Sequence, residues 1–257
     1  MIFSWKEDRA VEPDAAKVDE IVDWFARERE AHLSEGRCLE LAQLFHPRVI
    51  FLKTLRHASR VLDVGAGDGS LPIFKSWPQP VREDLRMYAF SLEKGANFDA
   101  YEGYEIGNWE KVRPDFGGMK FDAIFSSHFI EHIRDPLEFI SWSAERLSPG
   151  GRLYVEWPSD ESLGMPSRDE LVARGVDIMI SNFRDDKTHR ELPIAHEVAT
   201  RMRAAGLEVD LQGKARNPYL EEEVMALFGK NGKDASAVQL AFWSKYRWAQ
   251  YFVSTRT

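Results

Sequence analysis

The first part of the chain carries a hydrophobic pattern with helical spacing. Apolar residues recur at i, i+3, i+4 and i+7 over positions 18–25, with polar residues between them, which predicts one amphipathic helix. Two further apolar stretches, 39–45 and 47–55, are separated by His46-Pro47. They predict two more short helices, because the residue before a proline disfavours helical backbone. We therefore expect residues 1–57 to form an N-terminal helical cap.

From residue 58 onward, short β-branched and aliphatic runs alternate with segments long enough to hold helices. The predicted strands are Arg60–Val64, Arg86–Leu92, Phe121–Ser126, Arg152–Glu156, Leu207–Gln212 and Tyr246–Ser254. The predicted helices begin near Leu71, follow His128 through Leu147, and run from Pro193 to Ala205. Such alternation is typical of an α/β fold with a mostly parallel sheet covered on both faces. Residues 58–257 are expected to form this core.

Two longer segments interrupt the alternation, at about 159–191 and 213–245. The first is polar, and the second is too long for a tight hairpin between its flanking strands. Long connections in compact domains often carry function. We expect both to be inserted lid segments.

Composition restricts the classes of partner. The 257 residues hold 34 basic and 42 acidic side chains, a net charge of -8, which disfavours nucleic acid and anionic membranes as partners. The single Cys38 excludes an internal disulfide framework, and no apolar run approaches the roughly 18–20 residues of a membrane span. The first residues also lack the apolar segment of a signal peptide. We expect a cytoplasmic globular protein, and the sequence leaves its oligomeric state open.

The stretch Val61–Leu71, VLDVGAGDGSL, is the most informative part of the chain. Its apolar strand runs into three alternating glycines, Gly65, Gly67 and Gly69. Glycines there permit either a tight turn alone or a turn that a ligand approaches closely. Ser70 occupies the place of the third glycine of the dinucleotide fingerprint, and Asp63 and Asp68 would repel a pyrophosphate. A ligand without phosphates is favoured.

The second predicted strand ends in Leu92-Glu93-Lys94-Gly95. A carboxylate at that place can accept both hydroxyl protons of a ribose. Taken alone, Glu93 is equally well read as an ordinary exposed acid.

Four segments, in this order, resemble class I S-adenosylmethionine-dependent methyltransferases. VLDVGAGDGSL resembles their motif I, FSLEKG the acidic end of their second strand, FDAIFSSHFIEHIRDP their fourth-strand motif, and LSPGGRLYVEWPS their fifth-strand motif. The resemblance covers roughly Leu55 to Gly213 and implies a Rossmann-like, seven-stranded sheet with S-adenosyl-L-methionine as cofactor. The cofactor-binding residues that it implies are Asp63, Gly65, Ala66, Gly67, Glu93, Lys94, Asn108, Trp109, Ser126 and Ser127.

One implied contact departs from the family. The family usually has an acidic adenine-binding residue after the third strand, where this chain has Asn108 and Trp109. Trp109 fits a buried packing role equally well.

The candidate catalytic residues follow the fourth strand. If a helix begins near His128, then His128, Glu131 and His132 share one face at the rim of the cleft. His132 or His128 is then the candidate general base, because an imidazole titrates near neutral pH. The alternative is structural, with Glu131 capping helix amides and His132 making a hydrogen bond.

The same residues resemble a metal motif. H-x-x-E-H is similar to the E-x-x-E-H of ubiquinone-biosynthesis O-methyltransferases and of small-RNA 3′-end 2′-O-methyltransferases, which add a later histidine. The resemblance implies a divalent-metal site of His128, Glu131, His132 and His189. Three imidazoles and one carboxylate suit zinc, iron or manganese better than magnesium.

We therefore expect a small-molecule O-methyltransferase. NFRDDKTHRELP, followed by a helix and AAGLEV, resembles loops of bacterial carbohydrate and natural-product methyltransferases, which suggests a sugar or glycan precursor as acceptor. An N-methyltransferase acting on a small amine, and a non-catalytic cofactor-binding or partner-binding protein with the same fold, are the alternatives.

Overall fold

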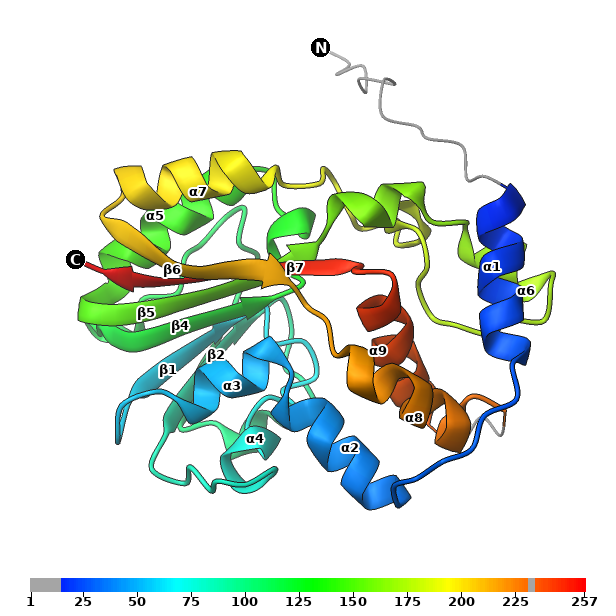
Figure 1. Ribbon diagram of the computed structural model, residues 1–257. Coiled ribbons are helices and arrows are strands. Elements are labelled where there is room, and N and C mark those ends of the chain that lie inside the picture. Colours follow the sequence, from blue (N-terminus) through cyan, green and yellow to red (C-terminus); the bar gives the residue numbers. More distant parts are fainter. Residues whose placement is uncertain (1–14, 231–233) are drawn as a thin grey trace, which may run out of the picture.

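A single sheet of seven strands organises the computed structural model, which describes residues 15–230 and 234–257 (Figure 1). The strands are β1 (Arg60–Val64), β2 (Arg86–Ser91), β3 (Gly103–Ile106), β4 (Phe121–Ser127), β5 (Leu147–Pro158), β6 (Leu207–Lys214) and β7 (Ala249–Arg256). Their order is β3-β2-β1-β4-β5-β7-β6. Strands β1 to β5 pair in parallel, and β7 runs antiparallel to both β5 and β6. The predicted Rossmann-like, mostly parallel α/β sheet is confirmed.

The sequence pattern missed one strand and misplaced the starts of two others. The strand predicted from Arg152 begins at Leu147. Strand β3 has only four residues, and its burial alternates between half-buried and exposed, so no apolar run marks it. The strand predicted from Tyr246 begins at Ala249 instead, because Tyr246 caps the C-terminal end of helix α9.

Nine helices in the described residues surround or extend the sheet. They are α1 (Ala15–Ala26), α2 (Glu35–Leu44), α3 (Pro47–Lys53), α4 (Ile73–Ser76), α5 (Pro136–Arg146), α6 (Arg168–Val172), α7 (Ala195–Ala204), α8 (Pro218–Phe228) and α9 (Ala235–Lys245). The helix predicted near Leu71 shrinks to the single turn of α4.

The helix predicted from His128 was wrong at its start. His128 has a φ of 53°, in the left-handed region that a right-handed helix excludes. Helix α5 begins at Pro136, whose ring suits a first helical position, and the Asp135 side chain accepts a hydrogen bond from the Glu138 amide. Between them lies only a short 3₁₀ turn, Ile130–His132.

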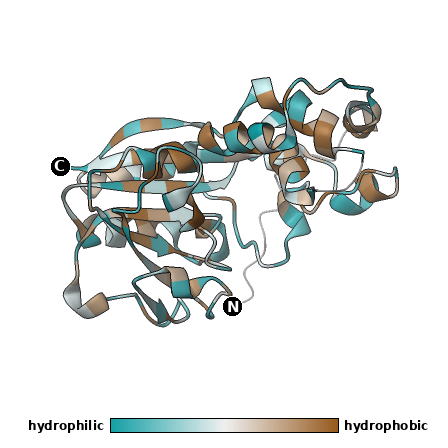
Figure 2. Cartoon of the chain, turned by 90° about the horizontal axis from the view of Figure 1, so that it is seen from below, coloured by the Kyte–Doolittle hydropathy of each residue, from teal (hydrophilic) through white to brown (hydrophobic). Residues whose placement is uncertain are grey.

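Helices cover both faces of the sheet. Helices α5 and α7 bury Phe139, Val198 and Met202 on one face. Helix α3 covers the other, where Phe51 packs 5.3 Å from Tyr154, centroid to centroid. Figure 2 shows hydrophobic residues along the central strands between these layers.

A second hydrophobic cluster lies beyond the carboxyl ends of the parallel strands. There α1 and α2 pack with α8 and α9, so that segments far apart in the sequence lie side by side (Figure 1). We call these four helices the helical lobe. Helix α3 packs on the sheet instead, although it belongs to the predicted 1–57 cap. Residues 1–14 of that cap and 231–233 of the 213–245 insertion lie outside the described residues, and the predicted domain boundaries stay predictions.

Within the described parts of the chain, every helix is too short or too polar to cross a membrane.

Candidate active site

The glycine-rich turn leaves β1 at the edge of the sheet where the parallel strands end. Gly65, Gly67 and Gly69 have φ angles of 82°, 55° and 82°, a region that glycine adopts without strain. The amides of Gly65 and Ala66 both donate to the Phe90 carbonyl at the end of β2. The turn is therefore held against the neighbouring strand.

The space around the three glycines differs. A Cβ at Gly65 would lie 2.7 Å from the Phe129 side chain, and one at Gly69 would lie 2.6 Å from Phe98. A Cβ at Gly67 would meet nothing within 4 Å. Gly67 thus presents bare backbone to open space, which fits a cofactor that approaches the turn closely.

The segment after β2 packs against this turn. A Cβ at Gly95 would lie 2.5 Å from the Gly67 carbonyl oxygen, and the Asn97 amide donates to the Asp68 carbonyl. Glu93 and Lys94 are exposed beside it, and Lys94 pairs with Asp99 at 3.0 Å. Glu93 therefore lies next to a segment that packs on the glycine-rich turn, and its ribose-binding role stays a prediction. The structural need for Gly95 was not predicted.

Asp63 lies buried beneath the turn, near the end of β1. The Tyr101 hydroxyl donates to its Oδ2 at 2.5 Å, and burial raises the pKa of Asp63 to about 7. This carboxyl can accept a hydrogen bond from a cofactor or carry a charge opposite an ammonium group, depending on pH.

The predicted adenine contacts occupy different surroundings. Asn108 is exposed, and its side chain accepts a hydrogen bond from the Glu110 amide. Trp109 is buried in an aromatic cluster, 5.5 Å from the Phe129 ring and 5.0 Å from the Trp142 ring. These contacts favour the packing role for Trp109.

The end of β4 carries two serines, Ser126 and Ser127. Ser126 is fully buried, and its hydroxyl has no hydrogen-bond partner among the described residues. Ser127 donates to Glu156 Oε1 at 3.0 Å. Both residues therefore lie at the predicted edge of the sheet.

His128 sits between two carboxylates. Its Nδ1 is 3.2 Å from Glu131 Oε1, and its Nε2 is 3.3 Å from Glu156 Oε1. Burial opposes protonation, but the two carboxylates together raise the pKa of His128 to about 9. In this arrangement His128 is an imidazolium that holds Glu131 in place.

Glu156 is the centre of this buried charge network, and the sequence analysis did not single it out. Arg48 contacts its Oε1 at 3.1 Å, and the Tyr154 hydroxyl donates to its Oε2. Burial opposes ionisation, but Arg48 and the protonated His128 hold the pKa of Glu156 well below its usual range. The available signal was a lone acid inside the apolar strand sequence YVEW.

Glu131, His132 and His189 form a second group beside this network. One ligand atom from each lies within 4.8 Å of the others. The 159–191 segment brings His189 there, because Arg190 donates to the carbonyls of Glu131 and His132. His128 is not part of this group, contrary to the set that the metal motif implied.

Hydrogen bonds fix which nitrogen of each of these histidines is free. His189 Nδ1 lies 2.5 Å from the Phe183 carbonyl, so Nδ1 is the donor. His132 Nδ1 lies 2.9 Å from the Thr188 hydroxyl, which donates its own proton to Asp186. Both Nε2 atoms therefore carry a lone pair when these imidazoles are neutral.

Glu131 is the third and most buried member of the group. Its side chain is fully buried, and Oε2 has no hydrogen-bond partner in the described part of the chain. A carboxylate and two imidazoles whose ligand atoms lie within 4.8 Å of one another suit a divalent cation.

A family model described as a methyltransferase domain matches residues 25–212. The chain therefore belongs to this methyltransferase family, and the predicted class, an S-adenosylmethionine-dependent methyltransferase, is confirmed.

Among curated proteins, the chain is 29% identical over 174 residues to a ubiquinone biosynthesis O-methyltransferase from Xanthomonas axonopodis pv. citri (strain 306). This match covers 63% of the chain and 68% of the relative. A protein of the same name from Chelativorans sp. (strain BNC1) is 33% identical over 106 residues, which cover 37% of the chain and 39% of that relative.

Solved structures share the fold at low identity. An S-adenosylmethionine-dependent methyltransferase from Mesorhizobium loti matches with a TM-score of 0.52 and 13% identity, covering 82% of this chain and 96% of that one. A cyclopropane synthase from Mycobacterium tuberculosis matches with a TM-score of 0.51 and 13% identity, covering 95% and 94%. One fold thus carries different reactions, and the acceptor must be argued from the site.

Proposed function

We propose that this enzyme methylates an oxygen atom of a small-molecule acceptor. The observation that carries the proposal is the group of Glu131, His132 and His189, which lies beside the loop that packs on the cofactor turn. S-adenosylmethionine supplies a methyl group already activated by its sulfonium. The protein then has to align the acceptor, exclude water and remove a proton.

His132 is proposed as the residue that receives the acceptor's proton. Its Nδ1–H is held by the Thr188–Asp186 pair, which leaves the Nε2 lone pair for a hydroxyl. The same Asp186 side chain can stabilise the imidazolium that forms. His128 and Glu131 act as positioning residues, because the two ring nitrogens of His128 face Glu131 and Glu156.

Glu131, His132 and His189 together also suit a divalent metal. Glu131 Oε2 and the Nε2 atoms of His132 and His189 would hold it, and such a nitrogen-rich set suits zinc, iron or manganese. A bound cation would lower the pKa of an acceptor hydroxyl. His132 would then be a ligand rather than a base.

Replacing His132 tests the site. We expect His132→Ala to retain affinity for S-adenosylhomocysteine but to lower turnover about 100-fold or more, since general-base catalysis typically contributes about 10²–10⁴-fold. His196→Ala is the matched control, because His196 is exposed on α7. Turnover equal to that of the control would remove His132 from the reaction.

Metal analysis separates the two roles of His132. A metal site predicts about one equivalent of cation in the purified protein, lost in both His132→Ala and His189→Ala. A protein without metal, whose activity survives chelation, would leave His132 as the base.

Two acceptor classes are proposed for test. The names of the curated relatives favour a phenolic, quinone-related acceptor. The loop resemblance in the sequence favours a sugar or glycan precursor. Radiolabelled methyl transfer to a catechol and to a sugar discriminates between them.

A further inference from the structure

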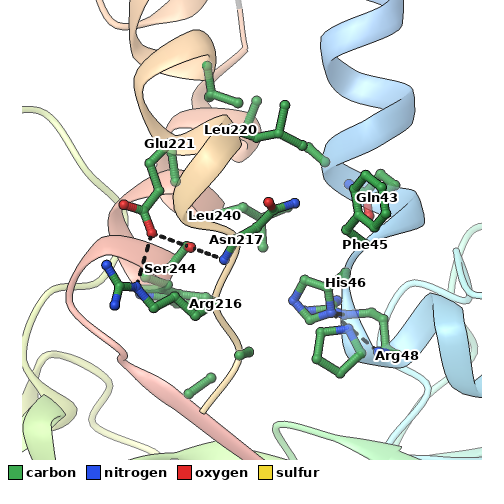
Figure 3. Close-up of a pocket in the computed structure, with 18 of the residues that line it drawn as sticks. Gln43, Phe45, His46, Arg48, Arg216, Asn217, Leu220, Glu221, Leu240 and Ser244 are labelled. Carbon is green, nitrogen blue, oxygen red and sulfur yellow. Dashed lines mark hydrogen bonds and ion pairs between the residues drawn. The ribbon is translucent and has the colours of Figure 1, made fainter.

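An apolar pocket opens between the two sides of the helical lobe. Its walls come from α2 and the turn after it on one side, and from α8 and α9 on the other (Figure 3). The apolar side chains that form these walls include Leu39, Ala42, Phe45, Leu220, Leu240 and Ala241. The cavity volume inside these walls is about 50 Å³, and the pocket continues into open solvent.

The inner end of this pocket reaches the candidate active site. Glu156 and Trp243 both line the pocket. Glu156 contacts His128 at 3.3 Å, and the Trp243 ring centroid lies 5.2 Å from that of His128. A molecule seated in the pocket therefore contacts two side chains that themselves touch His128, the first residue of the loop that carries Glu131 and His132.

The charges that line the pocket cancel in pairs. Arg48 pairs with Glu156 at 3.1 Å, and Arg216 with Glu221 at 3.7 Å. His46 is uncharged at neutral pH, because burial lowers its pKa to about 3. No further ionisable side chain lines the pocket among the residues that the structure describes. An uncharged ligand fits this balance, because a charged one would enter an apolar site without a free counter-charge.

Asn217 adds one polar requirement. Its side-chain amide points into the space between the helices (Figure 3), and Nδ2 is buried without a hydrogen-bond partner in the described part of the chain. A buried donor without an acceptor is costly. An oxygen atom of a bound molecule would satisfy it.

We propose that this pocket is the acceptor site, and that it takes an uncharged, largely apolar molecule with an oxygen atom that accepts from Asn217. This inference rests on the proposed function and narrows it. A sugar would leave most of its hydroxyl groups against apolar walls, whereas an aromatic ring with a hydrocarbon chain would bury its apolar surface.

The test compares two probes on the full-length protein saturated with S-adenosylhomocysteine. We expect 4-octylcatechol to bind on the order of 100-fold more tightly than catechol in isothermal titration, because several methylene groups leave water. Ala42→Phe, which fills the pocket, should weaken binding of 4-octylcatechol by about 10-fold or more. Ala204→Phe is the matched control, since Ala204 is exposed on α7. Asn217→Leu should weaken binding about 5-fold.

Three results would overturn the assignment. The first is equal affinity of the protein for 4-octylcatechol and for catechol. The second is an affinity for 4-octylcatechol that Ala42→Phe leaves unchanged. The third is binding of glucose 1-phosphate to the unmodified protein that is lost in Ala42→Phe. S-adenosylhomocysteine affinity, measured first in each variant, reports whether it is folded. Absence of that affinity in the unmodified protein would contradict the proposed function, and the probe titration without cofactor would still test the pocket.

Discussion

Alanine at Gly67 and at Gly65 should separate cofactor binding from stability. At Gly67, φ is 55° and an added Cβ meets no protein atom within 4 Å. The free energy of unfolding of the Gly67→Ala protein should therefore fall by only about 1–2 kcal/mol, which is the cost of an alanine in the left-handed region. Its new methyl group projects where we expect S-adenosylmethionine to approach the backbone, so affinity for S-adenosylhomocysteine should fall by about 10-fold or more.

Gly65→Ala should instead damage the fold. Its φ is 82°, and the added Cβ would lie 2.7 Å from the Phe129 side chain. Overpacking of this kind costs about 1–3 kcal/mol, in addition to the cost of the left-handed backbone. We expect a total loss of about 2–5 kcal/mol in the free energy of unfolding.

Denaturant melts without ligand and titrations with S-adenosylhomocysteine measure the two effects. Gly117→Ala is the matched control, because Gly117 has a φ of 64° and also has open space around it, but lies before β4, away from the glycine-rich turn. It should lose the same stability as Gly67→Ala and keep full affinity. If Gly67→Ala binds S-adenosylhomocysteine as tightly as this control, the cofactor does not lie against the turn.

Two pH dependences follow from the buried groups. Burial raises the pKa of Asp63 from 3.8 to about 7, so the stability that its protonated form contributes is lost as pH rises through 7. In melts between pH 4 and 8, the Asp63→Asn protein should not show this loss of stability. The same pH profile in the variant and the unmodified protein would refute the role of Asp63. Although burial opposes it, the carboxylates raise the pKa of His128 from 6.5 to about 9, so its contribution is complete below 6.5 and lost as pH rises through 9. Glu156→Gln should move the His128 titration, followed by NMR, to lower pH; an unmoved titration would show that Glu156 does not hold the proton there.

Local sequence patterns predicted most of the fold, because the relevant constraints are local. Alternating hydrophobic periods located the strands, and turn residues marked their ends. The pattern did not predict the short strand β3, because its residues alternate between half-buried and exposed and include no apolar run. The helix placed at His128 failed for a local reason too, because Asp135 and Pro136 provide a stronger start eight residues later.

The sequence by itself determined the glycine-rich turn and the succession of strands and helices along the chain, whereas the order of the strands in the sheet came from the structure. Gly65 and Gly67 are required by backbone geometry within a few residues, so the pattern carries that information. Only the tertiary structure decided which side chains meet in the candidate active site. The Thr188 hydroxyl meets His132 across 56 residues, and Arg48 meets Glu156 across 108. Such contacts depend on how intervening segments pack, and packing between distant side chains leaves no periodic trace in the chain.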